Sequence, residues 1–237
     1  RLVRRSDWTE DQQAWAERYF REQVLPVMSP MGLDPAHPFP RIQNKSLNFI
    51  VVVSGQDAYE RDAGIAVVQV PRALPRVLAM PSADGVEGVD LTLLSSMVHA
   101  HVEDLFPGMT VHECHQFRVT RNGDLWVDEE EVEDLMQALK GELRERQFAE
   151  AVRLEVPADC PDDLARFLLE NFNLEEDDLY RVDGPVNIHR LSSILDLLDR
   201  PDLLYPAFTP AIPKPFAADR DPFRVIREGD VLLHHPY

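Results

Sequence analysis

The sequence is poor in the residues that mark several common classes of protein. It has two cysteines, Cys114 and Cys160, among 237 residues, which argues for a reducing compartment and against a disulfide scaffold. No apolar run approaches the roughly 18 residues that a membrane-spanning helix needs. We therefore expect a cytoplasmic protein whose contact with a membrane, if it has one, is peripheral.

Positive charge is scarce as well. The 24 Lys and Arg residues stand against 42 Asp and Glu, which gives a formal net charge of −18. A chain this acidic repels DNA, RNA and anionic lipid unless a local basic groove offsets its mean charge. We therefore expect no nucleic-acid partner.

The glycine motifs that cradle phosphates are missing, because the sequence has neither a G-x-x-x-x-G-K nor a G-x-G-x-x-G pattern. The G-x-S-x-G elbow of many hydrolases is missing too. The candidates for a phosphohistidine by position are His234 and His235, and neither is followed by a lysine. These patterns predict no catalytic residue within the chain.

One group of potential metal ligands remains, formed by His99, His101, His112, Cys114 and His115. Residues two apart on a helix point about 200° away from each other, so His99 and His101 cannot share a ligand set. On a strand, His112 and Cys114 share a face and His115 points away. Each element supplies at most two ligands where zinc needs three or four, so we predict no metal site.

Hydrophobic periodicity and turn residues predict mixed secondary structure. Thr9 and Gln12 form a capping box that opens a helix to about Leu25. Residues 29–41 carry four prolines and predict an extended loop. The runs 47–53 and 65–70 are continuously apolar, as in strands covered on both faces.

The second half of the chain continues this mixture. Asn122-Gly123 predicts a hairpin between strands 111–120 and 125–127. The other expected elements are helices over 90–106, 128–143 and 191–198, a helix opened by Pro161, strands over 151–156 and around 180–182, and a strand from Val231. Six prolines over 201–222 predict an extended arm. The fold class is α+β: a mixed, largely antiparallel sheet with packed helices, an N-terminal linker helix and a C-terminal proline-rich extended arm.

One basic cluster stands out from the acidic background. Arg118, Arg121 and Asn122 lie on or beside the predicted hairpin turn, and the loop with Arg41, Asn44 and Lys45 carries further polar and basic groups. Arginine forks match phosphate geometry, so such a turn could steer a polyphosphate or a nucleotide. The alternative is an arginine pair that neutralises the nearby carboxylates Asp124, Asp128 and Glu129. Both interpretations are open at this point.

Several tracts, taken in order, resemble the bacterial polyphosphate kinase family. They are Pro38-Phe39-Pro40, Asn44-Lys45-Ser46-Leu47, Leu105-Phe106-Pro107-Gly108, Phe117 to Asn122, Ala151 to Glu155, Asp183-Gly184-Pro185, Arg200 to Leu203 and Leu233 to Tyr237. The resemblance covers the chain from about Leu25 to its end. The first residue is not Met, and with this resemblance we expect the chain to be a piece of a longer protein.

The resemblance implies an ATP-polyphosphate phosphotransferase, which moves the terminal phosphate of ATP reversibly onto polyphosphate through a phosphohistidine and Mg²⁺. It implies that residues 1–26 are the last helix of an N-terminal helical domain and 27–216 the middle, or head, domain. Residues 217–237 would be the linker and first strand of a catalytic half that lies outside this sequence and contains the phosphohistidine. ATP and Mg²⁺ would then be cofactors of the full-length enzyme, with none in this piece.

The same resemblance supplies the expected partners: the N-terminal and catalytic domains of the parent, a second copy in a homo-dimer or higher homo-oligomer, and polyphosphate and ATP in the parent. One hypothesis is an enzyme part in which Arg118, Arg121, Asn122 and Lys45 border the substrate path. The other is an acidic assembly domain with no ligand of its own. If the first helix packs on the N-terminal domain of the parent, Trp8, Trp15 and Tyr19 should be unusually exposed here.

Overall fold

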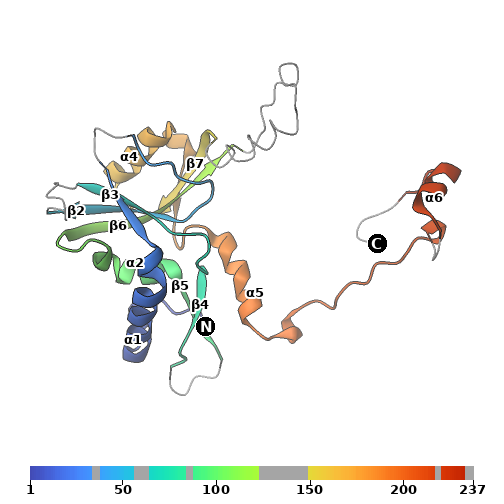
Figure 1. Cartoon of the computed structure of the whole chain (residues 1–237), viewed down its shortest axis with the longest axis horizontal. Helices are drawn as coiled ribbons and strands as arrows, with labels where there is room; N and C mark the ends of the chain where they lie inside the picture. Colours follow the sequence, from blue (N-terminus) through green and yellow to red (C-terminus); the bar gives the residue numbers. More distant parts are fainter. Residues whose placement is uncertain (34–37, 56–63, 84–87, 123–148, 217–219, 233–237) are drawn as a thin grey trace. The chain divides into compact units, whose positions relative to one another are not determined.

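The computed structural model describes residues 1–33, 38–55, 64–83, 88–122, 149–216 and 220–232. The chain divides into two compact units, Arg1–Leu198 and Asp199–Tyr237. Within the described residues, the first unit is built on a sheet of six strands in the order β1-β3-β2-β6-β7-β8 (Figure 1). The strands are β1 (Ser29–Gly32), β2 (Asn48–Ser54), β3 (Ile65–Gln69), β6 (Thr110–Arg121), β7 (Ala151–Pro157) and β8 (Leu179–Val182).

The neighbouring strands run antiparallel except for the last pair, in which β7 and β8 are parallel. Helix α4 (Asp162–Phe172) connects these two strands, with the short turn η6 (Glu176–Asp178) after it. The expected α+β class with a mixed, largely antiparallel sheet is confirmed. The predicted strands over 47–53, 65–70, 111–120, 151–156 and around 180–182 are also confirmed, with boundaries shifted by one or two residues.

The first helix begins where the sequence predicts. Thr9 caps α1 (Glu10–Tyr19), and the reciprocal Thr9–Gln12 capping box is formed. The helix continues through a π-helical turn, η2 (Phe20–Val24), and a 3-10 turn, η3 (Leu25–Val27), that contains Pro26. A short 3-10 turn, η1 (Arg5–Asp7), precedes it.

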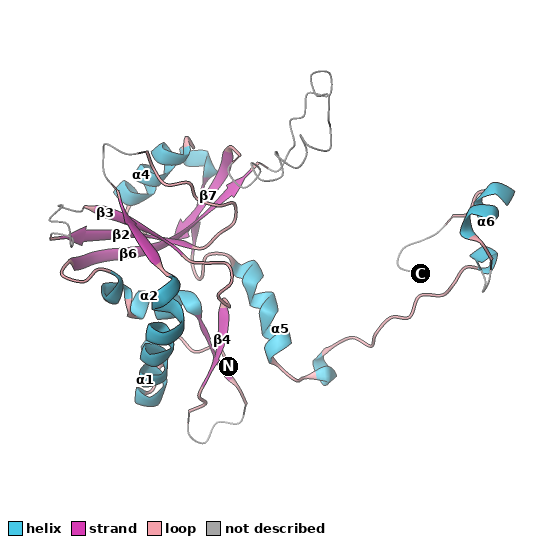
Figure 2. Ribbon diagram, viewed as in Figure 1, coloured by secondary structure: helices cyan, strands magenta, loops and turns pink. Residues whose placement is uncertain are grey.

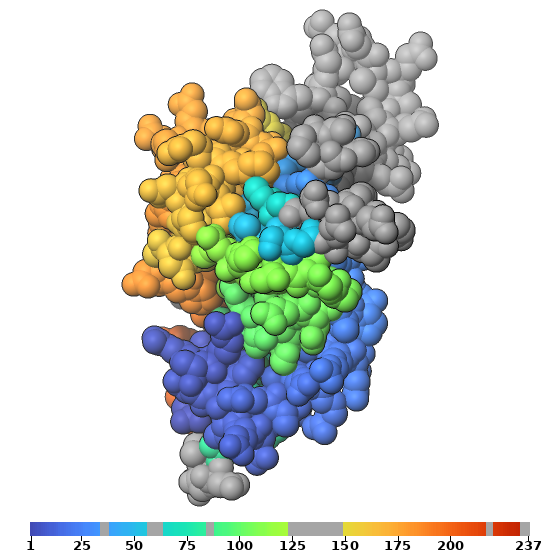
Figure 3. All heavy atoms as spheres, turned by 90° about the vertical axis from the view of Figure 1, so that its left-hand side faces the viewer, coloured from blue at the N-terminus to red at the C-terminus, as the bar shows by residue number. Residues whose placement is uncertain are grey.

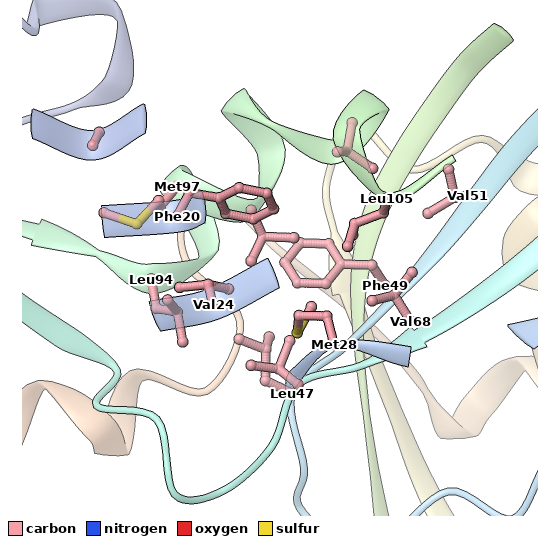
Figure 4. Packing of buried hydrophobic residues seen from close by; sticks show 14 of the residues in the cluster. Phe20, Val24, Met28, Leu47, Phe49, Val51, Val68, Leu94, Met97 and Leu105 are labelled. Carbon is pink, nitrogen blue, oxygen red and sulfur yellow. The ribbon is translucent and has the colours of Figure 1, made fainter. Parts of the chain in front are cut away.

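Strand β2 separates two hydrophobic cores, because its successive side chains point to opposite faces of the sheet. Phe49 and Val51 pack with α1, η2 and helix α2 (Leu94–Ala100), as the close view in Figure 4 shows. Ile50 packs with α4 on the other face. Figure 2 shows α1 and α2 on one side of the sheet and α4 on the other. Burial on both faces explains why this strand is continuously apolar.

The predicted helix over 90–106 is wrong for its first four residues. These form β5 (Asp90–Leu93), which pairs with β4 (Val77–Met80), and α2 follows with the 3-10 turn η4 (Val102–Leu105). The buried carboxylate of Asp90 accepts hydrogen bonds from Arg1, Gln12 and the Ala83 amide. These long-range partners hold Asp90 in the strand, and periodicity within the segment does not reveal them.

The extended loop predicted over 29–41 is wrong at its start, because Ser29–Gly32 forms strand β1. This strand lies at the edge of the sheet. An edge strand tolerates Pro30, since a missing N–H on the outer side breaks no hydrogen bond of the ladder.

The aromatic residues of the N-terminal segment do not form the exposed patch that the sequence predicts. Trp8 is buried, with 6% of its surface exposed, and belongs to the core shared by α1 and the sheet. Trp15 and Tyr19 are half-buried and stack on each other with ring centroids 5.3 Å apart. The first helix therefore packs within the first unit. In Figure 3 this segment (blue), β6 (green) and residues 151–182 (yellow and light orange) are exposed on the same face.

The last part of the first unit is the turn η7 (Ile188–Ser193) followed by α5 (Ile194–Leu197). The second unit contains the short turns η8 (Pro201–Leu203) and η9 (Lys214–Phe216) and helix α6 (Pro222–Glu228). Residues 204–213 between the two turns have no regular secondary structure, in agreement with the predicted extended arm. Val231 and Leu232 are not in a strand, so that prediction is wrong for the described residues.

The second strand of the predicted hairpin, 125–127, and the predicted helix 128–143 lie outside the described residues. The described end of the first strand, Arg118–Arg121, pairs with β7. Among the described helices, none is both long enough and apolar enough to cross a membrane.

Candidate functional site

The loop before β2 lies against the end of β6, which brings the predicted basic cluster together. The Lys45 amide donates to the Val119 carbonyl at 2.8 Å, and the Arg121 amide donates to Asn44 Oδ1 at 2.9 Å. Lys45 has a φ of 55° in the left-handed region, so the chain turns sharply there before entering β2. Two segments far apart in the sequence thus form one polar edge.

The side chain of Arg121 makes its contacts within the protein. Its Nε donates to the Ile42 carbonyl at 3.0 Å, and its Nη1 donates to the Ala149 carbonyl at 2.6 Å. Its guanidinium lies over the ring of Phe172, 5.7 Å from the centroid. Burial lowers the pKa of Arg121 from its ordinary value. The side chain therefore ties the 41–45 loop and the start of β7 to helix α4.

Arg118 is engaged differently. It forms an ion pair with Glu155 of β7, and Arg153 also donates to Glu155 at 3.1 Å. Only 15% of the Arg118 side chain and 10% of the Glu155 side chain are exposed. The guanidinium of Arg153 in turn lies 3.7 Å from the centroid of the Tyr180 ring.

Arg118 and Arg121 do not form a joint fork. Phe117 and Val119 are buried in the core against α4, and Arg121 contacts Phe172 on that side. Because side chains alternate along a strand, Arg118 lies on the opposite face. Asn122 continues the edge, and its amide donates to the Glu150 carbonyl at 2.8 Å. Lys45 is exposed and has no ion-pair partner among the described residues.

The alternative that paired the two arginines with Asp124, Asp128 and Glu129 names carboxylates outside the described residues. The observed partner of Arg118 is Glu155, which the sequence reasoning missed. A signal for it existed, because Arg153 and Glu155 alternate with apolar residues on the polar face of β7. The pairing register, in which Arg118 lies opposite Glu155, comes only with the sheet.

The histidines and cysteines do not assemble in the described parts of the chain, where no three His, Cys, Asp or Glu residues lie close enough together to hold a metal ion. Burial lowers the pKa of His99 to about 4, with smaller contributions from Arg5 and His115. Burial raises the pKa of the Cys114 thiol to about 12, so the thiol is protonated and unreactive at neutral pH. His234 and His235 lie outside the described residues.

Comparison with known proteins identifies the family of this α+β module. The model of the polyphosphate kinase middle domain matches residues 11–194. The chain therefore belongs to the polyphosphate kinase middle-domain family. The second unit begins beyond the matched residues.

Two curated relatives illustrate the similarity. The polyphosphate kinase of Pseudomonas aeruginosa is 52% identical over 237 residues, covering 100% of this chain and 34% of that protein. The polyphosphate kinase of Neisseria meningitidis serogroup C is 50% identical over 236 residues, again 100% of this chain and 34% of that protein. The chain spans about a third of the length of these relatives.

The fold is shared with a solved structure. The crystal structure of the polyphosphate kinase from Porphyromonas gingivalis matches with a TM-score of 0.68 and 21% sequence identity, covering 100% of this chain and 33% of that one. At this identity the match establishes the fold and carries no further weight.

Proposed function

We propose that this chain is the middle module of a polyphosphate kinase, a longer protein that reversibly transfers the terminal phosphate of ATP to polyphosphate through a phosphohistidine. The main support is sequence identity: about half of all residues along the whole chain are identical to those of proteins named polyphosphate kinase. The module itself is non-catalytic and acts in the reducing interior of the cell. It supports assembly of the enzyme and forms part of the wall along which the substrates pass.

ATP and Mg²⁺ belong, in this proposal, to the rest of the longer protein. Magnesium prefers a few carboxylate oxygens together with substrate phosphates. Among the described residues, no three His, Cys, Asp or Glu side chains lie together in a group that could hold a metal ion. We therefore assign no described residue to the metal and derive no step of the reaction from it.

Within the module, we assign Lys45, Arg118, Arg121 and Asn122 to the border of the substrate path. Lys45 supplies an exposed positive charge, and the hydrogen bond from the Arg121 amide to Asn44 positions the loop that carries it. Arg118 acts from the other face of the sheet, where Glu155 offsets its charge. In a chain of net charge −18, even one exposed cation on such an edge raises the local potential for a polyanion.

The assembly role is supported by exposed apolar side chains. Ile188 and Leu195, at the end of the first unit, are 57% and 65% exposed. In the second unit, Leu203 is 68% and Tyr205 98% exposed. Apolar surface of this kind is covered when domains or subunits pack together, so we propose the sister domains of the parent and a second copy as the partners.

The test uses the full-length protein that carries this module. The Lys45→Gln variant should weaken ATP-dependent polyphosphate synthesis and flatten its dependence on ionic strength, because it loses positive charge along the path. Arg118→Ala and Arg121→Ala should do the same when activity is expressed per folded protein. Arg18→Gln, an exposed change on the outer side of α1, is the matched control. Unchanged kinetics and salt dependence in the first three variants would contradict the assigned path. Absence of any kinase activity in the full-length protein would contradict the proposed function.

A further inference from the structure

A second group of cations lies elsewhere in the first unit. Arg72 follows β3, Arg76 precedes β4, and Arg190 belongs to η7. Burial, and to a smaller degree the positive charges of Arg190 and Arg72, lower the pKa of Arg76 to about 10. Arg76 and Arg190 line the same pocket, and the charge of Arg72 also acts on Arg76, so three like charges lie close together.

No carboxylate in the described part of the chain pairs with these arginines. Among the described residues, none of the three arginines has an Asp or Glu oxygen within the 4.0 Å of an ion pair, whereas Arg1, Arg181 and Arg200 each have one. Their described acceptors are backbone carbonyls: Arg72 donates to Asn44, and Arg76 Nη2 donates to Val70 at 3.1 Å. An uncompensated cluster of this kind is costly, and 42 acidic residues were available to neutralise it.

A small pocket lies beside the cluster. It has a volume of about 30 Å³ and is lined by Arg76 and Arg190, by Ser95 and Asn187, and by apolar residues that include Leu47 and Pro185. Arg76 Nη1 is buried and has no hydrogen-bond acceptor. A buried donor without an acceptor is destabilising and uncommon. A ligand oxygen at the pocket would supply the missing acceptor.

The size of the pocket limits the ligand. About 30 Å³ holds one or two atoms the size of a water oxygen, which excludes burial of a nucleoside. Arg72 and Arg190 are exposed and Arg76 is half-buried, so their guanidinium groups offer donors at the surface and one further donor below it. This arrangement suits a compact oxyanion that places one oxygen inward and the others toward solvent.

We propose that Arg72, Arg76 and Arg190 form a binding site for a phosphate group. Guanidinium forks match the oxygens of a phosphate in geometry and charge. Asn44, whose carbonyl accepts from Arg72, also accepts the Arg121 amide through its side chain, which connects this site to the edge that carries Lys45. The selection of phosphate among oxyanions rests on the proposed function, whereas the presence of an anion site rests on the geometry alone.

Calorimetric titration of the chain with tripolyphosphate, inorganic phosphate, Mg-ATP and citrate, each at two salt concentrations, tests the site. We expect saturable, salt-sensitive binding of tripolyphosphate and weaker binding of inorganic phosphate. A tighter Mg-ATP complex would identify a nucleotide as the source of the phosphate. Binding of citrate as tightly as of tripolyphosphate would overturn the choice of phosphate, and no binding of any of the four would overturn the site.

Substitutions of the three arginines test whether the anion binds at this site. Arg190→Gln removes a charge whose side chain has no hydrogen-bond partner among the described residues, so it should leave the fold intact and weaken tripolyphosphate binding about tenfold or more. The triple variant Arg72→Gln/Arg76→Gln/Arg190→Gln should abolish it. The control Arg18→Gln/Arg21→Gln/Arg166→Gln replaces three exposed arginines and changes the net charge equally, from −18 to −21.

Loss of binding in the control to the same degree as in the triple variant would overturn the placement, and so would unchanged binding in Arg190→Gln. Tripolyphosphate bound by the chain together with an inactive full-length protein would contradict the proposed function and leave the site standing. An active full-length protein whose middle module binds none of the four anions would contradict the site and leave the proposed function standing.

Discussion

Two groups of arginines in the first unit have the same chemistry and opposite surroundings. Arg118 and Arg121 have partners within the protein: Arg118 pairs with Glu155, and Arg121 contacts two carbonyls and the Phe172 ring. Arg72, Arg76 and Arg190 lie close together without a carboxylate among the described residues. The first group stabilises the sheet and its loops, whereas the second raises the electrostatic energy of the folded chain unless an anion is bound. The partners of an arginine, more than its presence, determine how much of its charge is available to a ligand.

The largest change in stability should come from removing the negative charge that pairs with Arg118. Glu155→Gln leaves Arg118 and Arg153 facing a neutral side chain in a largely buried place, and we expect a loss of about 3 kcal/mol in the free energy of unfolding. Urea denaturation of the chain measures it. Glu17→Gln, which breaks the exposed pair with Arg21, is the control and should cost at most about 0.5 kcal/mol. Equal effects of the two changes would show that Arg118 is not held as described.

Arg121→Met should have the next largest effect. The substitution keeps an apolar stem over Phe172 and leaves the Ile42 and Ala149 carbonyls without their donor, so we expect a loss of about 2 kcal/mol. Urea denaturation again gives the value, and hydrogen exchange of the Lys45 amide, which donates to Val119, reports whether the 41–45 loop loosens. Arg166→Met, an exposed change on α4, should leave both unchanged. Full protection of the Lys45 amide in the Arg121 variant would contradict the conclusion that Arg121 holds the 41–45 loop in place.

A smaller effect with the opposite sign is expected in the second group. Arg190→Gln removes one of three like charges, so at low salt the chain should gain about 0.5 kcal/mol or less in the free energy of unfolding. The gain should shrink in 0.5 M NaCl, because salt screens charges at the surface. Thermal unfolding at the two salt concentrations measures both values. A clear loss of stability would mean that Arg190 is engaged like Arg118, and the contrast between the two groups would disappear.

The fold class and most strands followed from the sequence because local patterns determine them. The continuous apolar run of β2 and the alternation of β7 each reflect which faces are covered, and the Thr9–Gln12 capping box acts within four residues. The errors have long-range causes. Asp90 is held in β5 by Arg1 and Gln12, and Ser29–Gly32 becomes a strand because it pairs with β3 at the edge of the sheet.

The candidate site was found only in part for the same reason. Sequence proximity identified Lys45, Arg121 and Asn122, which the fold does bring to one edge. It could not show that Arg118 points to the opposite face and meets Glu155, since that depends on the register of β6 and β7. The three arginines of the second group lie more than a hundred residues apart at the extremes, from Arg72 to Arg190, and only the folded chain unites them.

The topology of the sheet also orders the steps in which it can form. The β7–α4–β8 segment, residues 151–182, closes a parallel crossover from consecutive elements, so little chain entropy is lost in bringing its ends together. Strand β2 instead needs β6, which arrives only after β3, β4, β5 and α2. During synthesis from the N-terminus, strands β1, β2 and β3 must wait for residues 110–121 before β2 has a neighbour on its second side. The apolar faces of β2 and β3 are therefore the part of this chain most exposed to misassociation while it folds.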